Sequence, residues 1–347
     1  MNDGAIRFGI VGLGRAGWDI HVNSLKDRAG ARIVAVVDQL PARRAEAEQT
    51  LGCKAYSTLG AMLKRDDLDV VTVATPSARH APDTKKALAS GRHVIVEKPM
   101  ALSVAQADGM IEAARKAGRH LFVHQNYRFN REFTHLEETI RSGRLGRLFH
   151  IRFSSCAFSR RFDWQTLSKH GGGVLNNTGP HYVDQILRLL GSPVAQAMGD
   201  LQQITSAGDV EDHVKALIRA ENGTTADMEI SNVVSLPQPV PRWILYGTHG
   251  TLTSDGRKAV IRWLDPSELP PLEAVDGPVM SRSYENIADL NWQVAEEDTV
   301  GPDIGSFYDN VCGVLRGDQE MLVTPESVRE VIRTIAMIRK GTPFPGR

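Results

Sequence analysis

The sequence predicts an α/β domain with a doubly wound parallel sheet over residues 1–125, followed by an α+β domain over residues 126–347. In the first part, apolar strand-like runs alternate with helical patterns, which is typical of parallel sheets with helical crossovers. In the second part, alternating runs are separated by hairpin-type turns such as Asn222-Gly223 and Asp255-Gly256. A chain of 347 residues also exceeds what one hydrophobic core usually supports.

Charge and cysteine content narrow the classes of function. The 41 basic and 41 acidic residues balance, so nothing indicates a nucleic-acid or anionic membrane partner. The three cysteines lack the spacing of a metal site, and such a sparse, odd set suits a reducing cytoplasm. Strand character begins at Ile6, and no apolar run approaches the roughly 20 residues of a membrane span. We therefore expect a cytoplasmic protein without metal, nucleic-acid or membrane partners.

The first strand leads directly into a glycine-rich turn. Ile6–Val11 reads as a buried strand, and G-x-G-x-x-G follows at the start of a helix. In this context the first glycine permits a tight turn, the second lets a pyrophosphate approach, and the third lets helix pack on strand. The helix N-terminus adds free N–H donors for the phosphates. The residues predicted to bind a dinucleotide here are Gly12, Leu13, Gly14, Arg15, Ala16 and Gly17.

The second strand indicates which dinucleotide is bound. Ala31–Val37 ends at Asp38, whose carboxylate can accept hydrogen bonds from both ribose hydroxyls and would repel a 2′-phosphate. NAD is therefore favoured over NADP. The basic side chains of Arg43 and Arg44 nearby keep NADP as the alternative.

Strands and helices then continue to alternate: helices are predicted over 59–65, 81–90 and 104–117, and strands over 69–74, 93–96 and 120–124. Ligands of such sheets bind outside the carboxyl ends of the strands. One strand end carries Thr75-Pro76, with His80 close behind, and the next carries Glu97-Lys98-Pro99. Proline biases the residue before it towards an extended conformation, which would project the lysine into the crevice.

A second glycine-rich stretch, Gly171-Gly172-Gly173, precedes a helical pattern whose first turn can accept Pro180. Asn177, His181 and Asp184 are spaced i, i+4, i+7, so they would share one face of that helix. Such a face would present an amide, an imidazole and a carboxylate together. The alternative is an ordinary glycine-rich loop before an amphipathic helix.

The second domain offers further candidate contacts. The segment 125–130 leaves the last strand of the first domain, which would bring Tyr127 and Arg128 near the crevice. Arg161 and Trp164 could grip an anionic group or stack on a sugar face, or could belong to a solvated loop. Helices are predicted over 132–142 and 327–339, strands over 148–153, 214–220, 225–231 and 243–246, and an aperiodic surface excursion over 264–299.

Taken together, G-x-G-x-x-G, Asp38, Thr75-Pro76, Glu97-Lys98-Pro99 and the 171–184 block resemble the glucose–fructose oxidoreductase / inositol dehydrogenase / MocA-like (Gfo/Idh/MocA) family. The resemblance implies an N-terminal Rossmann domain and a C-terminal domain with a large, mostly antiparallel open sheet. In the family this sheet commonly packs against another subunit, so a homodimer or homotetramer is implied. The implied reaction is NAD(P)-dependent, reversible oxidation of a secondary alcohol on a sugar, glycoside, sugar derivative or cyclitol.

The resemblance also assigns roles. Lys98 and His181 match the family's catalytic lysine and histidine, and Asn177 stands where many members have aspartate. Which residue takes the hydroxyl proton stays open. The expected cofactor contacts beyond the first turn are Asp38, Arg43, Thr75, Pro76, His80, Glu97 and Lys98. The expected substrate contacts are Lys98, Tyr127, Arg128, Arg161, Trp164, Asn177 and His181.

Two other classes of function remain open at this point. One is an NAD-dependent, redox-neutral glycoside-cleaving enzyme, in which the cofactor is regenerated. The other is a non-catalytic sensor that binds a dinucleotide and a sugar. Lys98 and His181 argue against a sensor, whereas Asn177 in place of aspartate argues for it.

Overall fold

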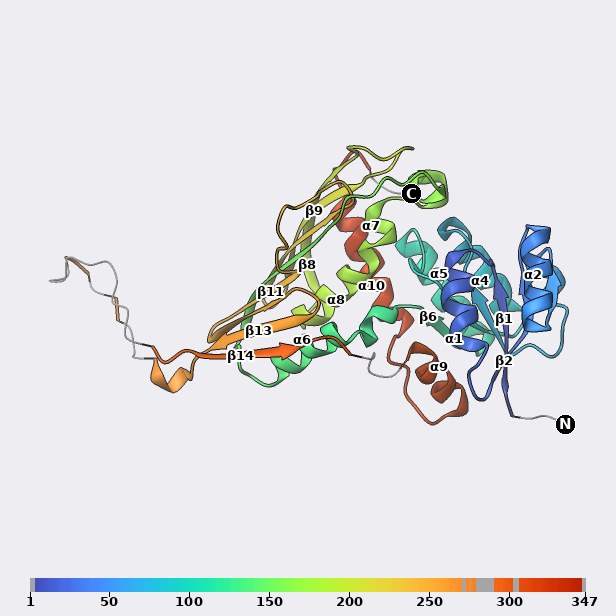
Figure 1. Cartoon of the computed structure of the whole chain (residues 1–347), viewed down its shortest axis with the longest axis horizontal. Helices are drawn as coiled ribbons and strands as arrows, with labels where there is room; N and C mark the ends of the chain where they lie inside the picture. Colours follow the sequence, from blue (N-terminus) through green and yellow to red (C-terminus); the bar gives the residue numbers. More distant parts are fainter. Residues whose placement is uncertain (1–3, 270–272, 275, 279–289, 302–305, 345–347) are drawn as a thin grey trace.

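The computed structural model describes residues 4–269, 273–274, 276–278, 290–301 and 306–344. Figure 1 shows two sheets that form separate layers, with helices α7, α8 and α10 lying between the second sheet and the N-terminal domain.

In the described part of the chain, the first sheet has six parallel strands in the order β3-β2-β1-β4-β5-β6. The strands are β1 (Ile6–Val11), β2 (Ala31–Val37), β3 (Lys54–Tyr56), β4 (Val70–Val73), β5 (His93–Val96) and β6 (Leu121–Val123). The predicted doubly wound sheet is confirmed. The strand order reverses between β1 and β4, and this switch point is where such sheets form a ligand crevice.

The helices of the first domain are η1 (Ala16–Val22, a π-helical segment), α1 (Asn23–Leu25), α2 (Pro41–Leu51), α3 (Leu59–Met62), η2 (Ser77–Arg79), α4 (His80–Ala89) and α5 (Val104–Ala117). The helix expected over 59–65 ends early, at Met62. The sequence pattern did not indicate α2 or β3. Within α2 Ala47 alone is buried, so it lacks an apolar stripe, and β3 has three residues.

Among the described residues, the second sheet has eight strands in the order β14-β13-β12-β11-β7-β10-β9-β8. They are β7 (Leu148–Cys156), β8 (Val194–Gln202), β9 (His213–Ala220), β10 (Thr225–Ser231), β11 (Trp243–Gly247), β12 (Gly250–Ser254), β13 (Lys258–Trp263) and β14 (Gln293–Asp298). β7 and β10 pair in parallel, and the other recorded pairs are antiparallel. The expectation of a large, mostly antiparallel sheet is therefore confirmed.

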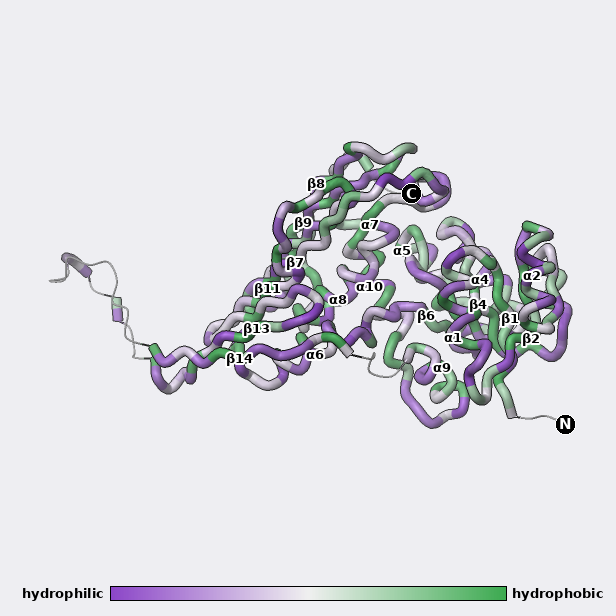
Figure 2. Tube along the Cα trace, viewed as in Figure 1, coloured by the Kyte–Doolittle hydropathy of each residue, from purple (hydrophilic) through white to green (hydrophobic). Residues whose placement is uncertain are grey.

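Helices cover one face of this second sheet. They are α6 (Arg131–Arg141), α7 (Val174–Asn177), α8 (Gly179–Leu190) and α10 (Pro325–Arg339), with short helical segments η3 (Asn126–Phe129), η4 (Trp164–Thr166) and η5 (Ser168–His170) near the domain junction. Buried and exposed side chains alternate along β9, and Figure 2 shows the corresponding mixed hydropathy of these strands. The side chains opposite the helices are therefore exposed.

The end of the chain returns to the first core. From α9 (Phe307–Arg316), Phe307, Tyr308 and Val311 pack with the strands of the N-terminal sheet, and Val328 of α10 joins them. Further along, α10 packs on α5, α8 and β8. Its N-cap is Thr324, whose side chain accepts a hydrogen bond from the backbone N–H of Ser327.

The stretch 264–299, which was expected to be an aperiodic surface excursion, contains two regular elements that the sequence did not indicate. η6 (Pro266–Glu268) and β14 lie within it, and β14 extends the second sheet as its edge strand. Residues 270–272, 275 and 279–289 of this stretch lie outside the described residues.

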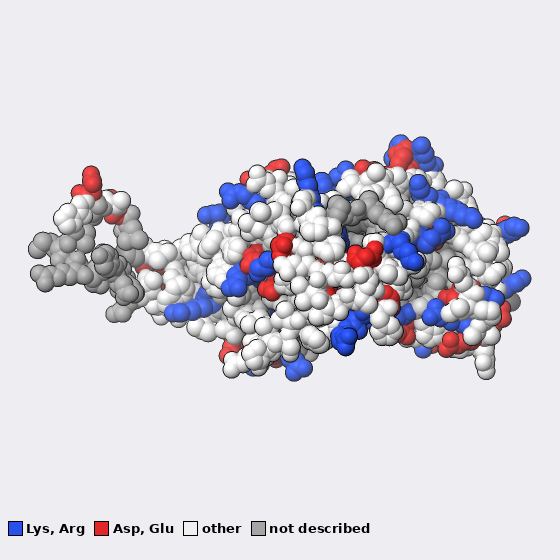
Figure 3. Space-filling view, turned by 90° about the horizontal axis from the view of Figure 1, so that it is seen from above, with Lys and Arg blue, Asp and Glu red and all other residues white. Residues whose placement is uncertain are grey.

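Across the described residues, no helix combines the length and the apolar character that a membrane crossing requires. Acidic and basic side chains are interspersed over the face seen in Figure 3, in keeping with the balanced net charge.

Candidate active site

The glycine-rich turn after β1 has the shape that a pyrophosphate needs. A Cβ on Gly17 would lie 1.8 Å from the carbonyl oxygen of Gly12, so no other residue fits there. In front of Gly14 there is open space, because nothing lies within 4 Å of where its Cβ would be. Leu13 is buried and Arg15 is exposed. This arrangement fits a dinucleotide whose phosphates lie against Gly14 and the first turn that begins at Ala16.

At the end of β2, Asp38 is fixed by backbone groups. One carboxylate oxygen accepts from Leu13 N at 2.8 Å and the other from Leu40 N at 2.9 Å. Each oxygen keeps a second lone pair for a ribose hydroxyl. Arg43 lies 3.5 Å from the carboxylate with a partly exposed side chain, which makes it the nearest cation that could meet a 2′-phosphate.

Behind Thr75 and Pro76, His80 is buried between two strand ends. Its Nδ1 lies 2.7 Å from the Pro99 carbonyl oxygen and its Nε2 2.8 Å from the Thr75 carbonyl oxygen. Burial lowers the pKa of His80 despite these two acceptors. His80 therefore ties the end of β4 to the loop after β5, and any influence on the cofactor acts through that backbone.

Lys98 reaches across to the second domain. Its Nζ donates to the backbone oxygen of Asn177 at 2.9 Å and lies 3.5 Å from the Asn177 side-chain oxygen. Burial lowers the pKa of Lys98, the negative charge of Glu97 opposes this effect, and the cations Arg15 and Arg161 reinforce it. An ammonium has three N–H groups, and Asn177 takes up at most two of them, so Lys98 can still donate a hydrogen bond to a ligand.

His181 lies at the start of α8, stacked on Tyr127. The two ring centroids are 3.9 Å apart at an interplanar angle of 16°. The imidazole is 7% exposed, and its Nδ1 is buried without a hydrogen-bond partner in the described residues. Burial first, and then the charge of Lys98, hold the pKa of His181 well below its ordinary value. The ring is thus uncharged at neutral pH and lies close enough to Lys98 to sense its charge.

The expectation that Asn177, His181 and Asp184 share one helical face is wrong for Asn177, whereas His181 and Asp184 both lie in α8, three residues apart. The segment breaks at Thr178: α7 ends at Asn177, and α8 begins at Gly179 with Pro180 in its first turn. Because proline has no N–H and restricts the residue before it, one continuous helix is disfavoured here.

Asp184 instead meets Arg128 in a buried ion pair. The two Arg128 nitrogens lie 2.8 and 2.5 Å from its carboxylate oxygens. Arg128 also donates to the Leu322 carbonyl oxygen at 3.1 Å and to Ser327 Oγ at 2.9 Å. With its donors occupied in this way, Arg128 joins η3, α8 and the start of α10, a structural role in place of the substrate contact that was expected.

Arg161 and Trp164 lie on the loop after β7. Arg161 pairs with Asp163 at 3.0 Å and contributes to the field at Lys98. Trp164 is 36% exposed at the start of η4. Both side chains are accessible, as a substrate contact requires.

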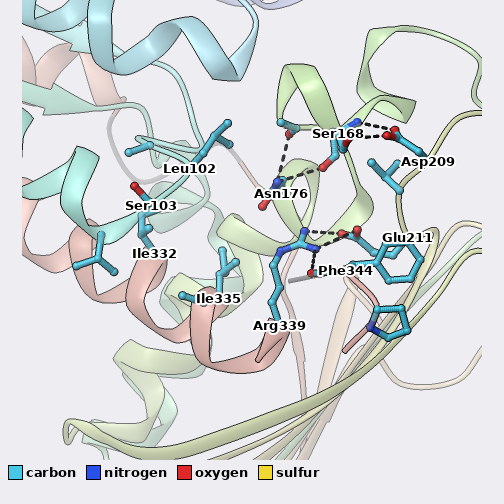
Figure 4. A pocket seen from close by; sticks show the side chains of 17 residues that line it. Leu102, Ser103, Ser168, Asn176, Asp209, Glu211, Ile332, Ile335, Arg339 and Phe344 are labelled. Carbon is cyan, nitrogen blue, oxygen red and sulfur yellow. Dashed lines mark hydrogen bonds and ion pairs between the residues drawn. The ribbon is translucent and has the colours of Figure 1, made fainter. Parts of the chain in front are cut away.

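A cavity of about 410 Å³ lies behind the glycine-rich block, shown in Figure 4. Glu211 and Arg339 form a buried ion pair at its wall, with Arg339 Nη2 2.6 Å from Glu211 Oε1. The same Glu211 oxygen accepts from Leu175 N at 3.0 Å. Glu211 therefore supports α7, which ends at Asn177. Neither Lys98 nor His181 belongs to the residues that line this cavity.

Sequence reasoning also missed the surroundings of Glu97. Its side chain does not point to the dinucleotide turn but into the protein, where His124 Nδ1 lies 2.8 Å and His21 Nε2 3.0 Å from Glu97 Oε1. Among the described residues this is the one cluster with the composition of a metal site. His21 and His124 follow the predicted turn and strand, but their convergence needs the folded sheet.

Comparisons with known proteins agree with this geometry. Residues 6–125 match the model of an oxidoreductase family with an NAD-binding Rossmann fold, and residues 133–253 match the C-terminal domain of the same family. The rhizopine catabolism protein MocA of Rhizobium meliloti is 30% identical over 70% of this chain and 76% of its own length. A myo-inositol 2-dehydrogenase of Thermotoga maritima is 29% identical over 72% of this chain and 75% of its own length.

Solved structures extend the match to nearly the whole chain. The WlbA dehydrogenase of Bordetella pertussis, in complex with NADH and UDP-GlcNAcA, superposes with a TM-score of 0.77 at 25% identity, covering 96% of this chain and 95% of that one. Alignments with curated relatives span from 45% to 95% of the relative's own length. The N-terminal domain is thus an NAD-binding Rossmann domain, and the chain belongs to the Gfo/Idh/MocA family of oxidoreductases.

Proposed function

We propose that this protein is an NAD-dependent dehydrogenase that reversibly oxidises a secondary alcohol of a sugar, glycoside, sugar derivative or cyclitol. The observation that carries the proposal is the meeting of Lys98 and His181 at the domain junction. Lys98 is held by Asn177 at 2.9 Å, and His181 is close enough that the Lys98 charge lowers its pKa. Lys98 follows β5 at the carboxyl edge of the sheet whose first turn fits a dinucleotide.

The two side chains suit two different tasks at the reacting hydroxyl: removing its proton and stabilising the negative charge left on its oxygen. NAD, when bound, supplies the hydride acceptor. The uncharged His181 can accept the hydroxyl proton as a general base. The Lys98 ammonium can donate a hydrogen bond to the same oxygen and stabilise the negative charge that develops on it. Asn177 holds the ammonium in place through its carbonyl oxygen.

The proposed choice of NAD over NADP rests on Asp38. Its carboxylate is held by Leu13 N and Leu40 N, so it faces the ribose as a fixed anion. A 2′-phosphate would meet this charge before it met Arg43, whose side chain is partly exposed and already pairs with Asp38.

The proposed substrate class rests on relatives and on charge. Relatives include a myo-inositol 2-dehydrogenase and a D-glucoside 3-dehydrogenase of Escherichia coli. Arg15 and Arg161 add positive charge around Lys98, against the buried carboxylate of Glu97 behind it. A substrate with a carboxylate or phosphate would gain from this field, which makes sugar acids and sugar nucleotides worth testing beside neutral polyols.

The test is NADH formation by the purified protein with NAD and a panel of inositols, glucosides, sugar acids and sugar nucleotides. Lys98→Ala and His181→Ala serve as controls. A signal that needs both side chains supports the dehydrogenase and names its substrate class. Silence across the panel, with NAD binding intact by calorimetry, contradicts the proposal. Release of a reducing sugar without net NADH would then identify the glycoside-cleaving alternative, and binding without any turnover the sensor.

A further inference from the structure

A buried carboxylate lies directly behind Lys98 and is surrounded by donors. Glu97 Oε2 accepts from the backbone N–H of Lys98 at 3.0 Å. Glu97 Oε1 lies 2.8 Å from His124 Nδ1 and 3.0 Å from His21 Nε2. On its other side His21 Nδ1 lies 2.6 Å from the Tyr308 hydroxyl. These side chains come from β5, the end of β6, η1 and α9, and each is at most 5% exposed.

The contacts fix which atoms carry protons. A neutral imidazole has one N–H, and the Tyr308 hydroxyl can donate to His21 Nδ1, which leaves the proton of His21 on Nε2, facing Glu97. The His21 ring is not aimed straight at the Glu97 oxygen, so it is the weaker of the two histidine contacts. His124 donates from Nδ1 to the same oxygen. Glu97 thus accepts two N–H groups, from Lys98 N and His124 Nδ1, and His21 Nε2 lies 3.0 Å from it as a third, poorly aligned neighbour.

The two histidines hold Glu97 in its charged form. Burial by itself raises the pKa of Glu97, but His124 and His21 together bring it well below its ordinary value. Burial lowers the pKa of His21, so His21 donates a hydrogen bond without competing for the charge. The result is an anion inside the protein next to the ammonium of Lys98.

We propose that His21, His124 and Tyr308 are positioning residues for Lys98, because they hold Glu97 as a buried anion that fixes the Lys98 backbone and balances its ammonium charge. The proposal rests on the proposed function in giving Lys98 a part in the reaction. It has a consequence that is independent of any substrate, because the charge state of Lys98 can be measured directly.

The sign of that consequence follows from the groups that face Lys98. Burial, Arg15 from the glycine-rich turn and Arg161 from the loop after β7 all favour the uncharged amine, and Glu97 opposes them. Asn177 and the uncharged His181 add no charge. Without the anion of Glu97, Lys98 would therefore lose its proton at lower pH.

The experiment follows the acylation of Lys98 by an amine-reactive reagent across pH, read by mass spectrometry of the Lys98 peptide, since only the uncharged amine reacts. In Glu97→Gln the midpoint should fall by about one pH unit or more. A smaller fall is expected in Tyr308→Phe, which keeps the Glu97 carboxylate but removes the hydroxyl that directs the His21 proton to Nε2. The matched control is His93→Gln: His93 lies at the opposite end of β5, against His120, and should leave the midpoint unchanged.

An unchanged midpoint in Glu97→Gln and in Tyr308→Phe would overturn the proposal, as would one equivalent of bound zinc in the wild-type protein, which would make the cluster a metal site. NAD calorimetry and circular dichroism establish that each variant is folded, and if Glu97→Gln does not fold, the outcome for Tyr308→Phe decides. A shifted midpoint together with a silent substrate panel would support the positioning role while contradicting the proposed reaction. Turnover of a substrate in the panel, together with unchanged midpoints, would support the proposed reaction while contradicting the positioning role.

Discussion

At the scale of single residues, the proposed chemistry depends on the charges of His181 and Lys98. Burial lowers both pKa values, and the Lys98 charge lowers that of His181 further. The base form of His181 exists above its pKa, so alcohol oxidation should stay constant down to a pH well below the ordinary histidine value. The ammonium of Lys98, which stabilises the charge on the reacting oxygen, is lost as pH rises through its lowered pKa, so the reaction should also slow at high pH, starting below the ordinary lysine value. Profiles of kcat/KM against pH in both directions measure this, and an acid limb at the ordinary histidine pKa would contradict it.

Asp38 allows a second residue-scale prediction. Asp38→Ala removes the acceptor of the ribose hydroxyls, and a charged hydrogen bond contributes roughly 1.5–3 kcal/mol. NAD affinity should fall about tenfold to a hundredfold. NADP affinity should fall less or rise, because Arg43 loses its carboxylate partner at 3.5 Å and becomes free to meet a 2′-phosphate.

Calorimetry with both dinucleotides measures the change, and Arg43→Ala in the same background should remove any gain for NADP. An equal loss for both would mean that Asp38 supports the turn through Leu13 N without reading the ribose.

The motifs after a strand and before a helix drew attention to Lys98 and His181, and the resemblance to the family paired them, but neither indicated their geometry. The motif residues lie at a strand end and a helix start, positions that local pattern predicts well. Arg128 and Asp184 lie 56 positions apart and form a buried pair that appears only in the folded chain. Nor did any local signal show that Glu97 faces His21 and His124.

At the scale of the elements, the first turn tolerates no side chain at its third glycine. Gly17→Ala would place a Cβ 1.8 Å from the Gly12 carbonyl oxygen, and a backbone atom cannot yield as a flexible side chain can. We expect loss of detectable NAD binding and a lower midpoint of thermal unfolding. Gly109→Ala in α5 is the control, since its new methyl would meet only Lys85 Nζ at 3.9 Å, and it should stabilise the helix by roughly 0.4–1 kcal/mol. Full NAD affinity in Gly17→Ala would show that the turn can shift.

The buried pair between η3 and α8 gives an element-scale prediction about stability. Arg128→Met leaves the Asp184 carboxylate buried without its partner, and breaking such a pair costs about 3–5 kcal/mol. Denaturant unfolding should show a loss of this size. Adding Asp184→Leu should recover part of it, because the uncompensated charge is then gone. A double variant that is less stable than the single one would argue that Asp184 has another essential contact.

Whether an element was predictable depended on its apolar pattern. β1, β2, β5 and α5 have the bounds that the sequence predicts, because each shows a continuous or periodic apolar run between turn residues. The edge strands β3 and β14 were not predicted. β14 shows no buried apolar run, because it is exposed or half-buried throughout and pairs with a single neighbour. The break at Thr178 was missed because helical spacing was read across Gly179-Pro180.

At the scale of the whole molecule, the exposed face of the second sheet suggests an assembly. Met198 of β8 and Leu217 of β9 are direct cross-strand partners and are 66% and 48% exposed. We propose that this face forms the interface of a homo-oligomer. Leu217→Glu should then lower the molar mass measured by light scattering, whereas Leu40→Glu, an exposed leucine of the first domain, should not. A wild-type monomer at high concentration would contradict the proposal.

The division of the chain at residue 125 remains a prediction. The sequence indicates where the parallel sheet ends, but it carries no local sign that α9 completes the first core. The contacts of α9 and the start of α10 with the strands of the first sheet join residues from roughly 180 positions apart, as for His124 and Phe307, to about 300, as for Phe8 and Tyr308, and only the three-dimensional structure brings them together.

This late closure has a consequence for biosynthesis. On the ribosome, the strands of the N-terminal sheet emerge long before Phe307, Tyr308 and Val328, which cover part of their apolar surface. At ordinary elongation rates the delay is roughly ten seconds or more. During that interval the nascent first domain exposes hydrophobic side chains and cannot complete its core. It is then either bound by chaperones or loosely collapsed until the end of the chain is synthesised. A premature stop codon before α9 would leave a product that proteolysis removes.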